Sequence, residues 1–162
     1  MTYPPKPVNG ILISGFPAPS WGYTYPPWLE RELRRRKYQI HVKVDYEPGR
    51  ELEFARAVWS VTKRRAEVAC WLASEFPWDF FIVVFTGTDR LQHAFWRFLD
   101  PGHPLHDPSL APTIRRLLIA YYKHLDRIIS ELISIAGHDA YVIVMSDHGF
   151  GPLRKFIHVN VW

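Results

Sequence analysis

The stretch "FFIVVFTGTDRLQHAFW", residues 80–96, decides the fold class that we expect for this chain. Its first six residues are all apolar, which is typical of a strand buried in a parallel sheet. The run stops at Thr-Gly-Thr, and the residues that follow carry Asp89 and His93, four positions apart. In α/β proteins, ligand-binding side chains collect beyond the carboxyl ends of the strands, so this pattern predicts an α/β fold.

A second stretch repeats the arrangement. "YVIVMSDHGFG", residues 141–151, is an apolar run that ends in Asp147, His148 and Gly149. The glycine allows the backbone to turn sharply just after the two polar side chains. We therefore expect both Asp-His pairs to lie at the same edge of one sheet.

Strand patterns and helix patterns alternate along the chain. Strands are predicted at residues 10–14, 39–44, 80–85 and 141–145, and helices at residues 28–38, 50–75, around His93 and Trp96, and at residues 114–136. Crossover connections of this length favour a mainly parallel sheet flanked by helices. The sequence thus predicts a single α/β domain over residues 1–162.

The composition is that of a soluble globular protein, with 48% hydrophobic and 22% charged residues among 162. No apolar run is long enough for a membrane span and no signal peptide is visible, so we expect a cytoplasmic protein without a membrane partner. The single cysteine, Cys70, excludes a disulfide framework and a thiolate metal cluster. Oxygen and nitrogen ligands remain.

Basic residues are concentrated in two runs, "RELRRRK" at residues 31–37 and "TKRR" at residues 62–65. The net charge of +4 raises the question of nucleic-acid binding. Both runs lie in helical patterns, where basic side chains can occupy the solvent face, and no nucleic-acid motif accompanies them. We do not expect nucleic acid to be a partner.

Asp89, His93, Asp147 and His148 are the candidate metal ligands. A spacing of four on a helix places Asp89 and His93 on one face, where both can bind the same cation. A mixture of carboxylates and imidazoles suits zinc or manganese, whereas calcium and magnesium prefer oxygen ligands throughout. Taken singly, each residue also fits an ordinary role: Asp89 as a helix cap, His93 as a packed or surface histidine, Asp147 as a turn residue.

Three segments carry a resemblance to a known family: "TGTDRLQH", "YYKHLDRIISEL" and "VIVMSDHGFGP". In this order, and with "PVNGILISGFPAPS" near the start, the chain resembles the type I phosphodiesterase/nucleotide pyrophosphatase branch of the alkaline phosphatase superfamily. The resemblance implies an alkaline phosphatase-like fold and a metal-dependent hydrolase of phosphodiester or nucleotide pyrophosphate bonds. It also implies two metal ions, one bound by Asp89 and His93 and the other by Asp147 and His148.

The sequence departs from the family pattern in two places. Family members carry a further strand with a metal-binding Asp and a Thr or Ser nucleophile, and another His ligand after the segment that matches "SDHG". The resemblance therefore implies a partial domain, an internal fragment whose catalytic residue is unassigned and whose activity alone is uncertain. The alternative is a non-catalytic fragment, a split subunit that needs a partner chain, or a remnant binding module. An uncovered sheet edge would favour self-association or a partner chain.

Other residues near these motifs receive no catalytic assignment. His158 is a weak candidate for the missing histidine, because the segment around it has a structural pattern. His103 and His106 lie in a loop and either border the site or face solvent. Thr86 and Thr88 carry hydroxyls close to Asp89, but the resemblance places the nucleophile on a different strand.

Overall fold

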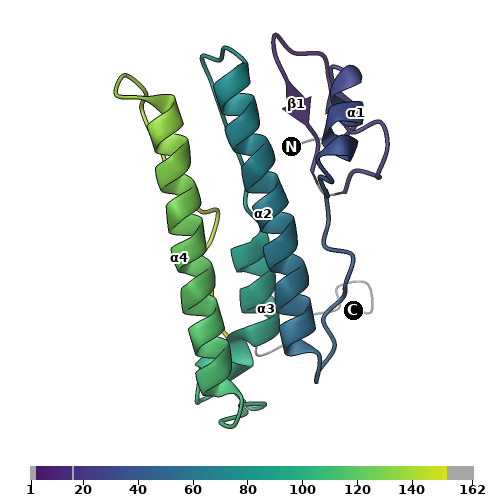
Figure 1. Cartoon of the computed structure of the whole chain (residues 1–162). Coiled ribbons are helices and arrows are strands. Elements are labelled where there is room, and N and C mark those ends of the chain that lie inside the picture. The colour runs from purple at the N-terminus through teal and green to yellow at the C-terminus, as the bar shows by residue number, and fades with distance from the viewer. Residues whose placement is uncertain (1–2, 16, 153–162) are drawn as a thin grey trace, which may run out of the picture.

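The computed structural model describes residues 3–15 and 17–152 of the chain. Four helices dominate this part of the molecule (Figure 1). The elements in chain order are β1 (Leu12–Ile13), β2 (Thr24–Tyr25), α1 (Trp28–Arg35), α2 (Glu51–Glu75), α3 (Gly87–Leu99) and α4 (Ala111–Ala136). The two short strands pair antiparallel, with Leu12 opposite Tyr25 and Ile13 opposite Thr24.

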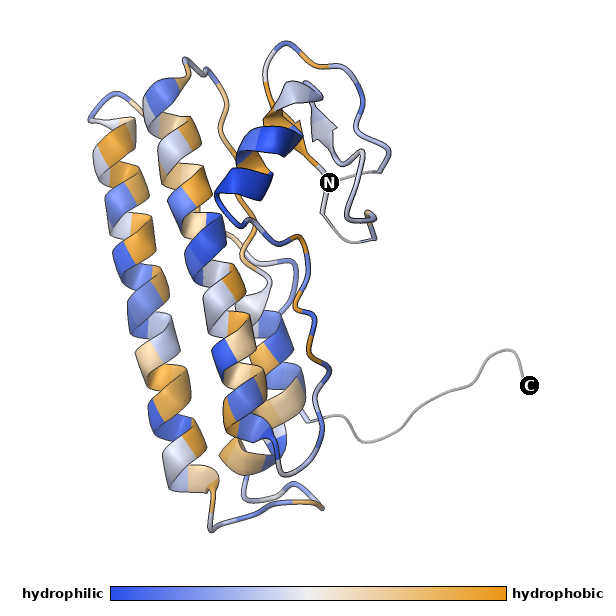
Figure 2. Cartoon of the chain, turned by 45° about the vertical axis from the view of Figure 1, so that its right-hand side comes forward, coloured by the Kyte–Doolittle hydropathy of each residue, from blue (hydrophilic) through white to orange (hydrophobic). Residues whose placement is uncertain are grey.

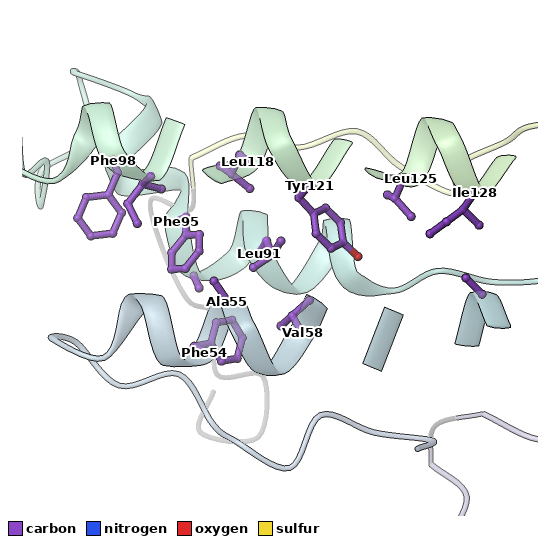
Figure 3. Packing of buried hydrophobic residues seen from close by; sticks show 13 residues of the cluster. Phe54, Ala55, Val58, Leu91, Phe95, Phe98, Leu118, Tyr121, Leu125 and Ile128 are labelled. Carbon is purple, nitrogen blue, oxygen red and sulfur yellow. The ribbon is translucent and has the colours of Figure 1, made fainter. Parts of the chain in front are cut away.

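The main core lies between α2, α3 and α4 (Figure 1). Helices α2 and α4 run side by side, and the shorter α3 packs against both of them. Figure 3 shows how their buried side chains meet: Phe54, Ala55 and Val58 from α2, Leu91, Phe95 and Phe98 from α3, and Leu118, Tyr121, Leu125 and Ile128 from α4. Burial of these apolar and aromatic surfaces stabilises the three-helix unit.

The hydrophobic spacing of α4 explains why it forms a helix and which face it buries. Ile114, Leu118, Tyr121, Leu125 and Ile128 recur every three or four residues, and all five are buried. The helix ends before Gly137, which adopts a positive φ of 79° that other residues rarely adopt. The apolar stripe from Ile114 to Ile128 thus faces the core between α2 and α3.

A second, smaller core joins α1 and the β1–β2 hairpin to the carboxyl half of α2. Leu29 and Leu33 of α1 are fully buried there, together with Tyr23, and they pack with Val68 and Leu72 of α2. The opposite face of α1 is strongly polar (Figure 2). Two of its arginines form ion pairs within the helix, Arg34 with Glu30 and Arg35 with Glu32, as expected for a solvated face.

The predicted helices are confirmed, with small shifts at their ends. The helix expected over residues 28–38 ends at Arg35, because Lys37 adopts a left-handed φ of 55° that a helix cannot continue through. The helices expected at residues 50–75 and 114–136 are α2 and α4. No helix in the described part of the chain is long and apolar enough to cross a membrane.

The predicted parallel sheet is not confirmed in the described residues. Residues 39–44, 80–85 and 141–145 are not strands there, and the strand expected over residues 10–14 is reduced to the two residues of β1. A strand requires backbone hydrogen bonds to a neighbour, and apolar runs predict an extended backbone without specifying that neighbour. In residues 80–85, half-buried and exposed side chains alternate, so the segment keeps the side-chain period of a strand without a ladder.

Candidate metal centre

Helix α3 carries the first pair of candidate ligands, and its start is fixed by close packing. Gly87, its first residue, is buried against the side chains of Tyr121 and Thr62. A Cβ atom at position 87 would lie 2.8 Å from Tyr121 Cζ and 2.9 Å from Thr62 Oγ1. The glycine therefore allows α3 to approach α2 and α4, and it sets where Asp89 lies two residues later.

Asp89 is the third residue of α3 and not its N-cap. The N-cap is Thr86, and no side chain caps this helix end by a hydrogen bond. The expectation that Asp89 could serve as a helix cap is therefore wrong for the N-cap position. A carboxylate in the first turn still interacts favourably with the helix dipole.

Asp89 and His93 lie on one face of α3, as their spacing predicts. His93 Nε2 is 3.4 Å from Asp89 Oδ1, and the side chains are 68% and 44% exposed, respectively. Both groups are thus in contact and open to solvent. Metal binding by them stays a prediction.

The segment that follows residues 141–145 brings the second pair to the same place. His148 Nε2 lies 3.9 Å from Asp89 Oδ1 and 3.8 Å from Asp147 Oδ1. Its other ring nitrogen, Nδ1, donates a hydrogen bond to the Gly149 carbonyl at 2.7 Å. That hydrogen bond raises the pKa of His148 above its ordinary value, and the Asp147 and Asp89 carboxylates raise it further.

The distances fit part of a metal site. Two ligands about 2.0–2.2 Å from one tetrahedral ion lie about 3.3–3.6 Å apart. The Asp89–His93 separation of 3.4 Å falls in that range, whereas the contacts of His148 are longer. Within residues 3–15 and 17–152, no three His, Cys, Asp or Glu side chains form a closed ligand set. The structure therefore shows one pair of candidate ligands at a metal-ligand spacing, with the second candidate pair beside it.

The Phe150 ring contacts a histidine from each of the two candidate pairs. The Phe150 ring lies 4.8 Å from the His93 ring, 5.6 Å from the Trp96 ring and 6.0 Å from the His148 ring, centroid to centroid. His93 and Trp96 belong to α3, and His148 precedes Phe150 by two residues.

The other sequence candidates have local partners. In the loop between α3 and α4, His103 Nδ1 accepts a hydrogen bond from the Leu105 backbone, and His106 Nδ1 bonds to the Arg97 carbonyl. Thr86 is the N-cap of α3, and the Thr88 carbonyl accepts a hydrogen bond from Gln92. His158 lies outside the described residues.

A comparison with models of protein families shows to which family the chain belongs. The model of the type I phosphodiesterase / nucleotide pyrophosphatase family matches residues 8–162. The chain belongs to this family. Neither the curated proteins nor the solved structures contain a match.

Membership in the type I phosphodiesterase/nucleotide pyrophosphatase family indicates a general class of substrate and of chemistry. The family acts on phosphodiester or nucleotide substrates and is generally metal-dependent. It suggests an alkaline phosphatase-like α/β fold, although the described residues contain only the two-stranded sheet.

Sequence reasoning missed two tertiary contacts beside the candidate ligands. The glycine of "TGTD" was visible, but its close packing against Tyr121 depends on a residue 34 positions away. Phe150 was visible within "SDHGFG", yet nothing in the spacing showed that its ring would pack on α3. Both are tertiary contacts between distant segments.

Proposed function

We propose that this chain is the metal-binding part of a phosphodiesterase or nucleotide pyrophosphatase. Asp89 and His93 hold one divalent ion and Asp147 and His148 hold a second, with zinc or manganese as the metals. The observation that carries the proposal is the convergence of His93 and His148 on the Asp89 carboxylate, from segments more than 50 residues apart. The substrate is a phosphodiester or nucleotide small molecule.

The residues of the chain have separate tasks in this function. Asp89, His93, Asp147 and His148 would hold the ions, which would supply activation of a nucleophile and stabilisation of the leaving oxygen of the phosphoester. The Gly149 carbonyl holds the Nδ1–H of His148, which leaves Nε2 as the nitrogen that faces Asp89 and Asp147. The Asp89 carboxylate lies between the two imidazoles and offsets the positive charge of a bound cation. Since these side chains are well exposed, an anionic phosphoester can reach them from solvent.

Isothermal titration calorimetry with Zn²⁺ or Mn²⁺ tests the proposal. We expect His93→Ala and His148→Ala each to weaken metal binding at least about tenfold, since each removes a ligand. His138→Ala is the matched control, because His138 is an exposed histidine just after α4. If metal uptake by the double variant His93→Ala/His148→Ala equals that of the parent, these residues are not the ligands.

An uncovered apolar surface favours a second candidate function, that of a subunit completed by a partner chain. Large apolar side chains are exposed in both expected strand segments; Phe80 is 80% exposed and Ile143 is 81% exposed. Large contiguous apolar patches on a protein surface often mark interaction sites. In this proposal the partner, either a second copy or another chain, covers these residues and supplies the nucleophile.

Light scattering after size-exclusion chromatography tests the second candidate. We expect a dimer or larger species for the parent, and a shift toward monomer for a variant with Phe80→Ser and Ile143→Ser. A control variant, Lys6→Ser, changes an exposed polar position and should leave the mass unchanged. A monomeric parent that binds metal fully would support the first candidate alone.

A further inference from the structure

Phe150 is distinguished by its burial. Residues 141–149 are all exposed, and Phe150 is the first residue after them whose side chain is partly buried. Its ring packs at 4.8 Å, almost perpendicular, on His93 and at 5.6 Å on Trp96. Both partners lie on α3, so the ring connects the segment that follows residues 141–145 to that helix.

The polar contacts of this segment do not replace that connection. The Ser146 hydroxyl donates to the His148 carbonyl, and His148 Nδ1 donates to the Gly149 carbonyl, so both hydrogen bonds remain within the segment. The contacts of His148 with Asp89 and Asp147 are 3.8–3.9 Å long, which is beyond a hydrogen bond. The aromatic contacts of Phe150 therefore connect residues 146–150 to α3, which the two hydrogen bonds of the segment do not.

We propose that Phe150 is a positioning residue that docks Asp147 and His148 onto α3, beside Asp89 and His93. The inference rests on the proposed metal-binding function and adds the residue that makes two ligand pairs into one site. The Phe150 ring packs edge-to-face on His93 and tilted on Trp96. In such pairs the edge of one ring attracts the face of the other, which stabilises the contact beyond apolar burial alone. Phe150 acts through the ligands and touches no metal.

Cobalt(II) binding, followed by its visible absorption, tests this role. We expect Phe150→Ala to weaken Co²⁺ binding about tenfold, as loss of a residue that orients a ligand does. Phe150→Tyr, which keeps the ring, should bind as the parent does, and Phe150→Leu should lie in between. Phe76→Leu is the control, because Phe76 belongs to a separate aromatic cluster with Trp28 and Trp71. Circular dichroism confirms that each variant retains its helices.

A double-variant comparison separates positioning from general stability. If Phe150 presents His148 to the site, His148→Ala should weaken Co²⁺ binding in the parent but change little in the Phe150→Ala background, whereas His93→Ala should still act there. In NMR spectra of the metal-free protein, the ring proton resonances of His93 should shift in the Phe150→Leu variant, because the neighbouring aromatic ring is lost. The same resonances should not move in the Phe76→Leu variant.

The possible results are distinguishable. Parent-like Co²⁺ affinity in Phe150→Ala, or an undiminished effect of His148→Ala in that background, overturns the positioning role and leaves the metal site intact. If neither His93→Ala nor His148→Ala weakens Co²⁺ binding in the parent, the proposed metal-binding function is wrong and the role of Phe150 falls with it.

Discussion

The hydroxyl groups of Thr62 and Tyr121 lie 2.6 Å apart in a buried hydrogen bond that joins α2 to α4. Burial of the phenol raises the pKa of Tyr121 above its ordinary value, because the buried site disfavours the charged phenolate. Gly87 packs directly on this pair, at the start of the helix that carries Asp89 and His93. The α2–α4 contact thus fixes the position of half of the candidate site.

Gly87→Ala should destabilise the protein. The added Cβ would overlap Tyr121 and Thr62, and α3 would have to shift away from the core. We expect a loss of about 3 kcal/mol in the free energy of unfolding, measured by urea denaturation. Gly15→Ala is the control, since a Cβ there meets no atom within 4 Å. Equal stability of both variants would contradict the packing role.

Removal of the Tyr121 hydroxyl should relieve part of that overlap. Tyr121→Phe alone leaves Thr62 bonded to the Val58 carbonyl and should cost about 1 kcal/mol. Combined with Gly87→Ala, the cost should be less than the sum of the two changes, because both act on one contact. Additive costs would show that position 87 is not coupled to the Tyr121 hydroxyl.

Arg65 should stabilise the two extended segments that flank α2. Its Nη1 donates to the Val84 carbonyl at 2.9 Å and its Nη2 to the Ile40 carbonyl at 3.0 Å. Arg65→Met should therefore lower the free energy of unfolding by about 1–3 kcal/mol, measured by urea denaturation. Arg64→Met, which removes only an exposed pair with Glu67, is the matched control and should change stability little.

Glu51 should make the protein sensitive to acid. Burial raises the pKa of this carboxyl, but hydrogen bonds from the Gly49 backbone and the Tyr46 hydroxyl, together with Arg97, outweigh it, and the pKa is lowered overall. A lowered pKa means that the stabilisation is present above the unfolded-state pKa of about 4.3 and is lost as the pH falls through the folded-state pKa.

The measurement is unfolding by urea from pH 7 to pH 3. Glu51→Gln should be less stable than the parent at pH 7, and the difference should shrink below about pH 4. Glu67→Gln, at an exposed position on the same helix, should follow the parent at every pH. A constant difference between Glu51→Gln and the parent would contradict the lowered pKa.

Catalysis by this chain alone should be weak. The nucleophile implied by the family resemblance has no counterpart assigned in the sequence, and groups that act as a unit lose most of the rate when one is missing. We expect hydrolysis of bis-p-nitrophenyl phosphate little faster than in buffer with the same Zn²⁺ or Mn²⁺. Turnover of about 1 per second or more would show that a residue of this chain is the nucleophile, and Thr86 and Thr88 would be the first to substitute.

The sequence by itself determined the helices and the spacing of the candidate ligands. Hydrophobic residues every three or four positions suffice to predict α2 and α4, because a helix satisfies its own backbone hydrogen bonds. The spacing of four likewise placed Asp89 and His93 in contact, since one helical turn brings such residues together. These are local relationships within one element.

Only the tertiary structure decided which distant segments meet. The apolar run of residues 80–85 indicates an extended, partly buried segment. The sequence pattern does not show that the Val84 carbonyl accepts a hydrogen bond from Arg65, 19 positions earlier in the chain. The approach of His148 to Asp89 and the packing of Gly87 on Tyr121 likewise depend on how α2, α3 and α4 pack. A strand, a buried glycine and a cluster of candidate ligands all need partners from elsewhere in the chain, and local pattern does not specify those partners.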